Sequence, residues 1–174
     1  MNGHPGGEAH TRRLLELSAL PRGAKVLDMG AGAGEAVQQM RQSGYLASGV
    51  DLSPRSPLVR QGNFLQTGFS AGSFDAVLSE CSFYVSGDVH GALREAYRLL
   101  KSGGLLLLSD VFTADPSSLL REAGFDILHA EDLTPQWREY YLEMLWREDD
   151  ACRLPHVKCT YWIIIGRRKE DGPV

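Results

Sequence analysis

Three glycines whose backbone could bind a ligand lie close together in the sequence. Gly30, Gly32 and Gly34 alternate with alanines shortly after Asp28. Glycine lets the backbone approach a ligand closely, and the start of a helix offers unpaired N–H groups to that ligand. The apolar run around Asp28 predicts a strand, and the residues after Gly34 predict a helix. A strand, a glycine turn and a helix in this order are typical of a cradle for a nucleotide-containing cofactor.

The spacing of these glycines argues against two common nucleotide sites. The dinucleotide fingerprint is G-x-G-x-x-G. Glu35 stands at its third glycine position when the fingerprint starts at Gly30, and Val37 stands there when it starts at Gly32. The sequence also lacks G-K-[S/T], so a P-loop has no support. A nicotinamide-dependent oxidoreductase is therefore a disfavoured alternative.

Asp28 and Asp51 are the acids expected to hold the cofactor. A carboxylate attracts an ammonium and repels a pyrophosphate, so Asp28 suits a cofactor with an amino-acid end. Its alternative role is a turn residue that caps the next helix. Asp51 follows Gly30 by about the interval of an acid that grips ribose hydroxyls at the end of a second strand. Taken alone Asp51 would be a turn former, but behind the glycine turn we expect it to bind ribose.

Four segments together resemble a known enzyme family. The first, Val26–Gly34, resembles motif I of class I S-adenosylmethionine-dependent methyltransferases. Gly49–Ser53 is similar to the family's second motif, and 73–77 and 99–104 are similar to two later landmarks. The resemblance runs in motif order over residues 24–112, and a weaker similarity extends from Ala123 to the final strand. It implies a Rossmann-like fold and S-adenosylmethionine as cofactor, with S-adenosylhomocysteine as the product.

The resemblance places the cofactor at the glycine turn and at the ends of the strands that follow. The residues expected to bind it are Asp28, Met29, Gly30, Ala31, Gly32, Gly34, Asp51, Leu52, Gly62, Asn63, Phe64 and Ser79. In the family a Gly-Asp pair lies near the adenine, whereas this chain has Gly62 and Asn63 there. The amide oxygen of Asn63 could still accept a hydrogen bond from the adenine amine. Phe64 either flanks the adenine ring or enters the core.

The residues after the fourth expected strand are the candidates for handling the methyl acceptor. Methyl transfer is an in-line displacement, and a general base is needed only when the acceptor must lose a proton. Many enzymes that methylate amino groups of bases or glutamine carry N/D-P-P-Y/F here, but residues 79–84 read Ser-Glu-Cys-Ser-Phe-Tyr. Glu80 and Tyr84 are candidate catalytic residues, as a base or an acceptor-orienting group, although Glu80 could equally anchor a loop. Cys81 is expected to pack rather than to react.

The hydrophobic pattern predicts strands that alternate with helices. Strands are expected at 25–29, 45–50, 62–65, 73–80, 105–108, 125–130 and 161–165, and helices at 8–18, 35–44, 88–103, 115–124 and 134–145. This order predicts an α/β, Rossmann-like, doubly wound and mostly parallel sheet with helices on both faces. The ligand crevice of such a sheet lies at the carboxyl ends of its strands. Residues expected at those ends are Asp28, Asp51, Asn63, Glu80 and Asp110.

The connection after the second strand is unusually short. Residues 51–62 leave no room for the helix that relatives place there, so we expect a fold that is trimmed at this point. The rest of the chain predicts one S-adenosylmethionine-binding domain over residues 24–174, preceded by an arm and a helix over residues 1–23.

The N-terminal arm is a candidate lid over the cofactor. Gly6 and Gly7 would supply the hinge, and His4 would touch the carboxylate of the cofactor or the acceptor. The alternative is a frayed tail. Trp137, Tyr140 and Tyr141 on a later helix could form a lid over the acceptor, but an aromatic stripe at helical spacing is more often part of the core.

Composition limits the partners. The chain has 18 Lys and Arg residues against 22 Asp and Glu, a net charge of −4, and its basic residues are dispersed. Nucleic acid is therefore not expected as a partner. We expect a small-molecule acceptor instead. Three cysteines without CxxC spacing predict no metal site. No apolar run is long enough to span a membrane, so we expect a cytoplasmic protein without membrane contact. The expected oligomeric state is a monomer or homodimer. An alternative function is a protein that binds S-adenosylmethionine without transferring its methyl group, as a sensor or assembly partner.

Overall fold

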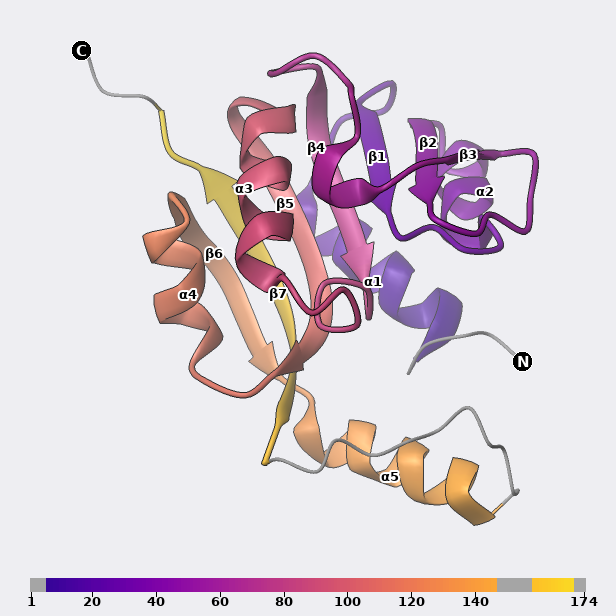
Figure 1. Cartoon of the computed structure of the whole chain (residues 1–174), viewed down its shortest axis with the longest axis vertical. Helices are drawn as coiled ribbons and strands as arrows, with labels where there is room; N and C mark the ends of the chain where they lie inside the picture. Colours follow the sequence, from indigo (N-terminus) through magenta and orange to yellow (C-terminus); the bar gives the residue numbers. More distant parts are fainter. Residues whose placement is uncertain (1–5, 147–157, 171–174) are drawn as a thin grey trace.

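Strands and helices alternate along the chain in the computed structural model, which describes residues 6–146 and 158–170 (Figure 1). The elements in this part are α1 (Gly7–Ser18), β1 (Lys25–Met29), α2 (Glu35–Gln42), β2 (Leu46–Asp51), β3 (Val59–Gln61), a 3-10 turn (Phe64–Gln66), β4 (Phe74–Glu80), α3 (Val89–Leu99), β5 (Leu100–Phe112), α4 (Pro116–Glu122), β6 (Phe125–Asp132), α5 (Thr134–Trp146) and β7 (Thr160–Arg168). No helix in the described residues combines the length and apolar content that crossing a membrane requires.

The strands form one mixed sheet in the order β3-β2-β1-β4-β5-β7-β6. The pairs from β3 to β5 are parallel, and β7 is antiparallel to both of its neighbours. β1 lies between β2 and β4, so successive connections leave it in opposite directions. In a sheet of this type the ligand crevice forms at that switch point, outside the carboxyl ends of the strands. The expected Rossmann-like, mostly parallel sheet is confirmed.

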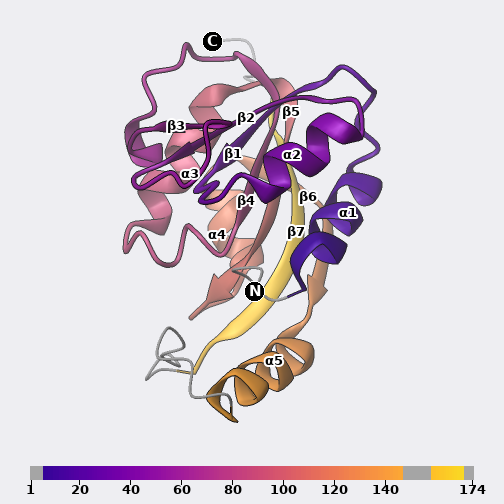
Figure 2. The same cartoon turned by 90° about the vertical axis from the view of Figure 1, so that its right-hand side faces the viewer.

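Helices cover both faces of the sheet (Figure 2). α1 and α2 lie on one face, where Leu14 and Met40 join a buried cluster with Trp137 from α5. α3 and α4 lie on the opposite face, where Leu93 and Leu120 join a second cluster. Burying an apolar stripe from each helix against the sheet gives the two layers of the core. In Figure 1, α5 extends beyond the carboxyl ends of β4 and β5.

Capping residues begin two helices where the sequence predicts them. The side chain of Asp88 accepts a hydrogen bond from the N–H of Gly91 at 2.7 Å, which caps α3. Asp115 accepts from the N–H groups of Ser117 and Ser118, and Pro116 stands in the first turn of α4. These bonds satisfy donors that a helix start otherwise leaves unpaired.

Two expected boundaries are wrong. The third strand is β3, Val59–Gln61, and not 62–65. The side chain of Asn63 instead accepts a hydrogen bond from the N–H of Leu65 at 2.9 Å and caps a 3-10 turn, a local competitor of strand pairing. The helix expected at 88–103 ends at Leu99, because β5 begins at once with Leu100 opposite Phe74 of β4.

The loop between β2 and β3 contains no helix within its residues 52–58, as the sequence predicts. Its backbone supports the glycine turn instead, since the N–H of Arg55 donates to the carbonyl of Gly32 at 3.0 Å. The trimmed connection therefore lies directly beside the turn that follows β1.

Gly49 in β2 is the point where the sheet meets the glycine turn. A Cβ atom at Gly49 would lie 2.6 Å from the Cβ of Ala31 and 3.0 Å from Cγ2 of Val37. Real side chains do not approach so closely, so even one methyl group at this position must displace the turn or α2.

We expect Gly49→Ala to lower the free energy of unfolding by about 1–3 kcal/mol, the usual cost of overpacking a filled core. Urea denaturation followed by circular dichroism measures this. The control is Ser48→Ala on the same strand, where a half-buried hydroxyl is lost and no atom is added. A Gly49→Ala protein as stable as the parent would show that β2 is not packed tightly against the turn.

Candidate functional site

The glycine turn after β1 has a backbone shape that favours glycine. Gly30, Gly32 and Gly34 have φ angles of +90°, +48° and +78°. Other residues rarely adopt this left-handed region. The N–H groups of Gly30 and Ala31 both donate to the carbonyl of Val50, at 2.9 and 3.1 Å. The turn is thus fixed between the ends of β1 and β2 and the start of α2.

Two adjoining cavities open around this turn. The first has a volume of about 310 Å³ and is lined by Asp28, Gly30, Ala31, Gly32, Ala33, Glu35, Ala36, Asp51, Arg55, Glu80, Cys81 and Ser82. The second has a volume of about 360 Å³ and is lined by Gly30, Asp51, Leu52, Asn63, Phe64, Leu65, Ser82, Val85 and Ser86. Gly30, Asp51 and Ser82 line both cavities, so the two form one bent site.

The two cavities differ in chemistry. Four carboxylates and one guanidinium, from Arg55, line the first, which we name the acidic cavity. The second, which we name the apolar cavity, lies between Leu52 and Val85, whose side chains are 61% and 77% exposed, with Phe64 behind them. Large apolar side chains exposed at the rim of a cavity are typical of a site that receives a flat apolar group.

Asp28 is the most deeply buried acid of the acidic cavity, with 4% of its surface exposed. Burial raises the pKa of Asp28 well above its usual range, and the nearby carboxylates of Glu80 and Asp51 raise it further. Like charges in a water-poor site disfavour ionisation, and a cation placed among them reverses that effect. The cavity is therefore suited to a cationic ligand.

Asp51 lies where the two cavities meet. Its Oδ2 accepts a hydrogen bond from the N–H of Gly32 at 2.9 Å, and its Oδ1 accepts one from the N–H of Ser53 at 2.8 Å. An ionised carboxylate has about four acceptor sites, so these two bonds leave capacity for ligand hydroxyls. Asp51 both holds the turn and faces the ligand space.

Glu80 enters the acidic cavity from the carboxyl end of β4. Its Oε2 accepts a hydrogen bond from Oγ1 of Thr11 in α1 at 2.8 Å. Burial raises the pKa of Glu80 to about 7, and the Thr11 bond acts in the opposite direction. A carboxylate with this pKa can hold or release a proton near neutral pH.

Cys81 has a strained backbone and an unreactive thiol. Its φ angle is +54°, an uncommon value for a residue with a side chain. Its N–H donates to the carbonyl of Ser109 at 2.8 Å, and its Sγ lies 3.6 Å from the hydroxyl of Tyr161. Burial raises the pKa of the Cys81 thiol, with Asp110 adding to the effect, so the thiolate needed for nucleophilic attack is disfavoured.

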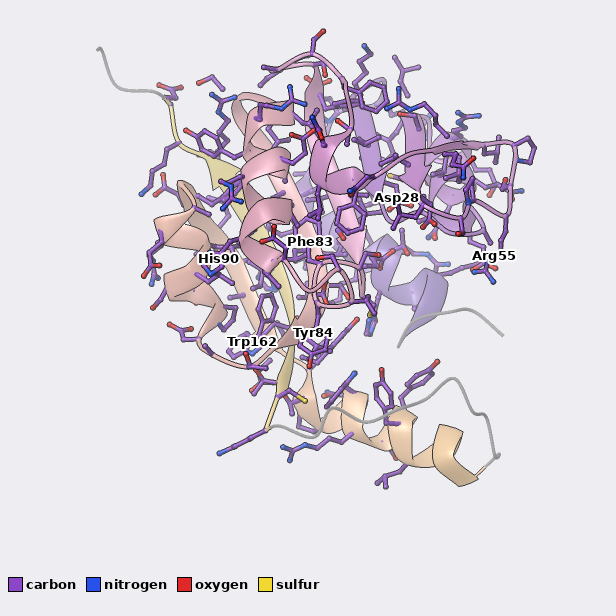
Figure 3. The ribbon with its side chains drawn as sticks, in the orientation of Figure 1. Asp28, Arg55, Phe83, Tyr84, His90 and Trp162 are labelled. Atoms are coloured by element: carbon purple, nitrogen blue, oxygen red, sulfur yellow. The ribbon has the colours of Figure 1, made fainter. Side chains whose placement is uncertain are left out.

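The segment after β4 is held by Asp110 at the end of β5. Oδ2 of Asp110 accepts hydrogen bonds from the N–H groups of Phe83 at 2.8 Å and Tyr84 at 3.3 Å. Burial raises the pKa of Asp110 to about 6, and these backbone donors oppose the rise. Figure 3 shows Phe83 and Tyr84 near the carboxyl end of β4, while Asp28 and Arg55 lie toward β1 and the loop after β2.

Most of the residues predicted from the sequence come together here. Those that line the cavities are Asp28, Gly30, Ala31, Gly32, Asp51, Leu52, Asn63, Phe64 and Glu80. Gly34 caps α2 beside the site, and Gly62 bonds through its N–H to the carbonyl of Asp51.

Three predicted residues lie behind the cavity walls. Met29 and Ser79 are fully buried, and the hydroxyl of Ser79 donates to the carbonyl of Met29 at 3.0 Å. The side chain of Tyr84 packs against the cluster on the α1 side of the sheet and lines neither cavity. His4 lies outside the described residues, so the expected contact with it stays a prediction.

Sequence reasoning missed Thr11, Arg55 and Ser82. Thr11 lies in a helix far from the motifs, and nothing in its spacing links it to Glu80. Arg55 follows Pro54 in a loop without a pattern, so its place in the sequence gives no signal of its place in the site. Within the described residues no three His, Cys, Asp or Glu side chains are grouped to hold a metal ion.

The glycine turn fits the cofactor that the sequence motifs imply. A Cβ atom at Gly30 would lie 2.1 Å from Oγ of Ser82, and one at Gly32 would lie 3.4 Å from Nη2 of Arg55, inside the acidic cavity. The lining offers carboxylates for an ammonium and hydroxyls, and an apolar slot for a ring. S-adenosylmethionine carries these groups, whereas the pyrophosphate of a dinucleotide would face four acids.

Comparison with known proteins identifies the family. The sequence model of a protein family described as "Methyltransferase domain" matches residues 7–158 of this chain. Sarcosine/dimethylglycine N-methyltransferase of Halorhodospira halochloris is 31% identical over 180 residues, covering 87% of this chain and 64% of that protein. Arsenite methyltransferase of Aquipseudomonas alcaligenes is 33% identical over 123 residues, covering 56% of this chain and 36% of that protein. The chain thus spans only part of the length of these relatives.

Solved structures share the fold. A putative sarcosine dimethylglycine methyltransferase from Galdieria sulphuraria matches with a TM-score of 0.71 and 21% identity, over 93% of this chain and 84% of that one. Phosphoethanolamine N-methyltransferase 2 of Haemonchus contortus, in complex with S-adenosyl-L-methionine, matches with a TM-score of 0.75 and 19% identity, over 96% of this chain and 54% of that one. With the family model spanning most of the described sheet, the chain belongs to the class I S-adenosylmethionine-dependent methyltransferases.

Proposed function

We propose that this chain transfers the methyl group of S-adenosylmethionine to a small-molecule acceptor. The observation that carries the proposal is the pair of adjoining cavities, one acidic and one apolar, which meet at Asp51. The acidic cavity suits the ammonium and sulfonium end of the cofactor, and the apolar cavity suits its adenine. Asp51 at the junction suits the ribose between them.

We assign the cofactor contacts by the chemistry of each wall. Asp28 attracts the ammonium, and Arg55 at the opposite side of the same cavity attracts the carboxylate. Leu52 and Val85 flank the adenine, and Asn63 offers polar atoms at its edge. With this orientation the methyl group lies near the segment from Glu80 to Ser82, which also lines the acidic cavity.

The acceptor is proposed to be small for two reasons. The chain has a net charge of −4, which disfavours nucleic acid as the acceptor. Relatives named for sarcosine, dimethylglycine and arsenite as acceptors support a small molecule in the same place. Cofactor binding without methyl transfer remains the competing function, favoured by the trimmed loop after β2, and a turnover assay over these acceptors separates the two.

Isothermal titration calorimetry tests the proposed function directly. We expect S-adenosylmethionine and S-adenosylhomocysteine to bind, and NAD to bind far more weakly or not at all, because its pyrophosphate would meet the four carboxylates of the acidic cavity. Equal or tighter binding of NAD would refute the assignment of the site.

Asp51→Ala should weaken binding of S-adenosylmethionine by about 10- to 150-fold, the equivalent of losing about 1.5–3 kcal/mol of charged hydrogen bonds. Asp51→Asn should lose less, since its amide oxygen still accepts from the N–H of Gly32. Asp126→Ala removes an exposed carboxylate on β6, remote from the cavities, and serves as the control. An unchanged dissociation constant in Asp51→Ala would place Asp51 outside the binding contacts.

Binding should also release protons. Burial raises the pKa of Glu80 to about 7 in the free protein, so a large part of this carboxyl group is protonated at pH 6.5, and the pKa of Asp28 is also raised above its usual range. A cationic ligand favours their ionised forms and lowers both pKa values, so affinity should rise as the pH rises from 5.5 to about 7. Calorimetry at pH 6.5 in two buffers of different ionisation enthalpy measures the protons released. Glu80→Gln should reduce this number, and a buffer-independent enthalpy in the parent protein would contradict the prediction.

A further inference from the structure

A hydroxyl group from the N-terminal helix bonds to Glu80, one of the residues that line the acidic cavity. Thr11 of α1 is 1% exposed, although it lies outside the strands that build the site. Its Oγ1 donates to Oε2 of Glu80 at 2.8 Å, across 69 residues of sequence. A buried hydrogen bond between a neutral hydroxyl and a carboxylate fixes the direction of that carboxylate and favours its charged form.

We propose that Thr11 is a positioning residue for methyl transfer, which holds the carboxylate of Glu80 where it takes a proton from the acceptor. The inference rests on the proposed function and names its acceptor as a protic nucleophile, a compound that attacks through nitrogen, oxygen or sulfur and loses a proton when methylated.

The helix that carries Thr11 is firmly held. Leu14 and Leu15 of α1 are buried in the core cluster on that face of the sheet. Nη2 of Arg13 lies 2.6 Å from Oε2 of Glu131 on β6, and Nε2 of Gln39 on α2 donates to the carbonyl of Glu8 at 3.0 Å. These contacts on three sides place the Thr11 hydroxyl at a fixed point relative to the end of β4.

The backbone of Glu80 is fixed from the other side. Oγ of Ser82 donates to the carbonyl of Glu80 at 3.1 Å, and the N–H of Cys81 donates to the carbonyl of Ser109. The backbone of Glu80 is thus held by β5 and the following residues, and the bond from Thr11 directs its carboxylate.

The groups around Glu80 explain why a hydroxyl is needed there. Titratable and charged neighbours come from every adjoining element: His10 of α1, Asp28 of β1, Glu35 of α2, Asp51 of β2, Arg55 of the next loop, Cys81 after β4, Asp110 of β5 and Tyr161 of β7. Most of the charged ones are acids, which disfavour a further negative charge. Burial raises the pKa of Glu80 to about 7, and the bond from Thr11 limits that rise.

The proton balance of the reaction follows from these positions. The lone pair of the acceptor atom forms the new bond to the methyl carbon, and the electrons of the breaking carbon–sulfur bond pass to sulfur. The proton leaves the acceptor atom, is taken up by the carboxylate of Glu80 and then passes to solvent. A base must be ionised to do this, so a bond that favours the charged form of Glu80 extends activity toward lower pH.

The test compares Thr11→Val, which keeps the shape and loses the hydroxyl, with Thr11→Ser, which keeps the hydroxyl. Carbon-13 NMR of labelled glutamate carboxyls follows the titration of Glu80 in the cofactor-free protein, with Glu80→Gln identifying the signal. Thr11→Val should raise the pKa of Glu80 by about one, the loss expected for a hydrogen bond to a charged group, and Thr11→Ser should restore it.

Activity is measured as the pH profile of kcat/KM with sarcosine, catechol and a small thiol as acceptors. In Thr11→Val the acidic limb of the profile should move up with the NMR titration, so that kcat/KM falls about tenfold at pH 6 and approaches the parent value at pH 9. Glu80→Gln should lose the acidic limb, and adding Thr11→Val to Glu80→Gln should change nothing further.

The outcomes separate the inference from the proposed function. If the parent protein fails to bind S-adenosylmethionine in calorimetry, the proposed function fails. If it binds the cofactor but Thr11→Val leaves the Glu80 titration unchanged, the inference about Thr11 is overturned. A Thr11→Val protein with a lower melting temperature and an unmoved pH profile would also overturn it, because it would reduce Thr11 to a purely structural role.

Discussion

Repulsion between carboxylates is the constraint on which this site depends. Adjacent parallel strands end at the same edge of a sheet, so the acids that end β1, β2 and β4 converge on one small cavity. Burial raises the pKa values of Asp28 and Glu80, and the carboxylates of Glu80 and Asp51 raise that of Asp28 further. An arrangement of this kind persists only on a rigid scaffold, and a cationic ligand relieves it. The same repulsion selects a sulfonium and ammonium cofactor over a pyrophosphate.

The scaffold that opposes this repulsion is largely backbone. Asp51 and the carbonyl of Val50 hold the glycine turn, and the trimmed loop adds a bond from Arg55 to Gly32. On the other side, Asp110 holds two N–H groups of the segment after β4, and the left-handed backbone at Cys81 is kept in place by Ser109. Strain at such a residue survives where its surroundings over-determine it, as they do here beside the ligand space.

The sequence predicted what depends on local pattern. Three left-handed glycines, a buried acid at the end of a strand and an apolar helix stripe each leave a periodic or positional signal, so the sheet and about half of the cavity lining were predictable. Asn63 was misread because a side-chain cap competes with strand pairing over a few residues. The side chain of Ser79 follows the pleat of β4 and turns inward to Met29, and the predicted contact of Ser79 with the cofactor stays a prediction. Thr11 and Arg55 were missed because tertiary packing alone brings them to the acids.

The N-terminal helix contacts the site through the bond from Thr11 to Glu80, apart from the hinged lid expected from the glycines before it. Any covering role for residues 1–5 stays a prediction, since they lie outside the described part. α1 itself is tied to the core by Leu14, to β6 by Arg13 and to α2 through Gln39, so a hinge before it would not move Thr11. Enzymes of one family that act on different acceptors can share a cofactor site and differ in the residues around the acceptor. In this chain the proposed role of Thr11 gives α1 a part in acceptor handling through Glu80, and the burial of Glu80 sets the pH range in which that carboxylate is ionised.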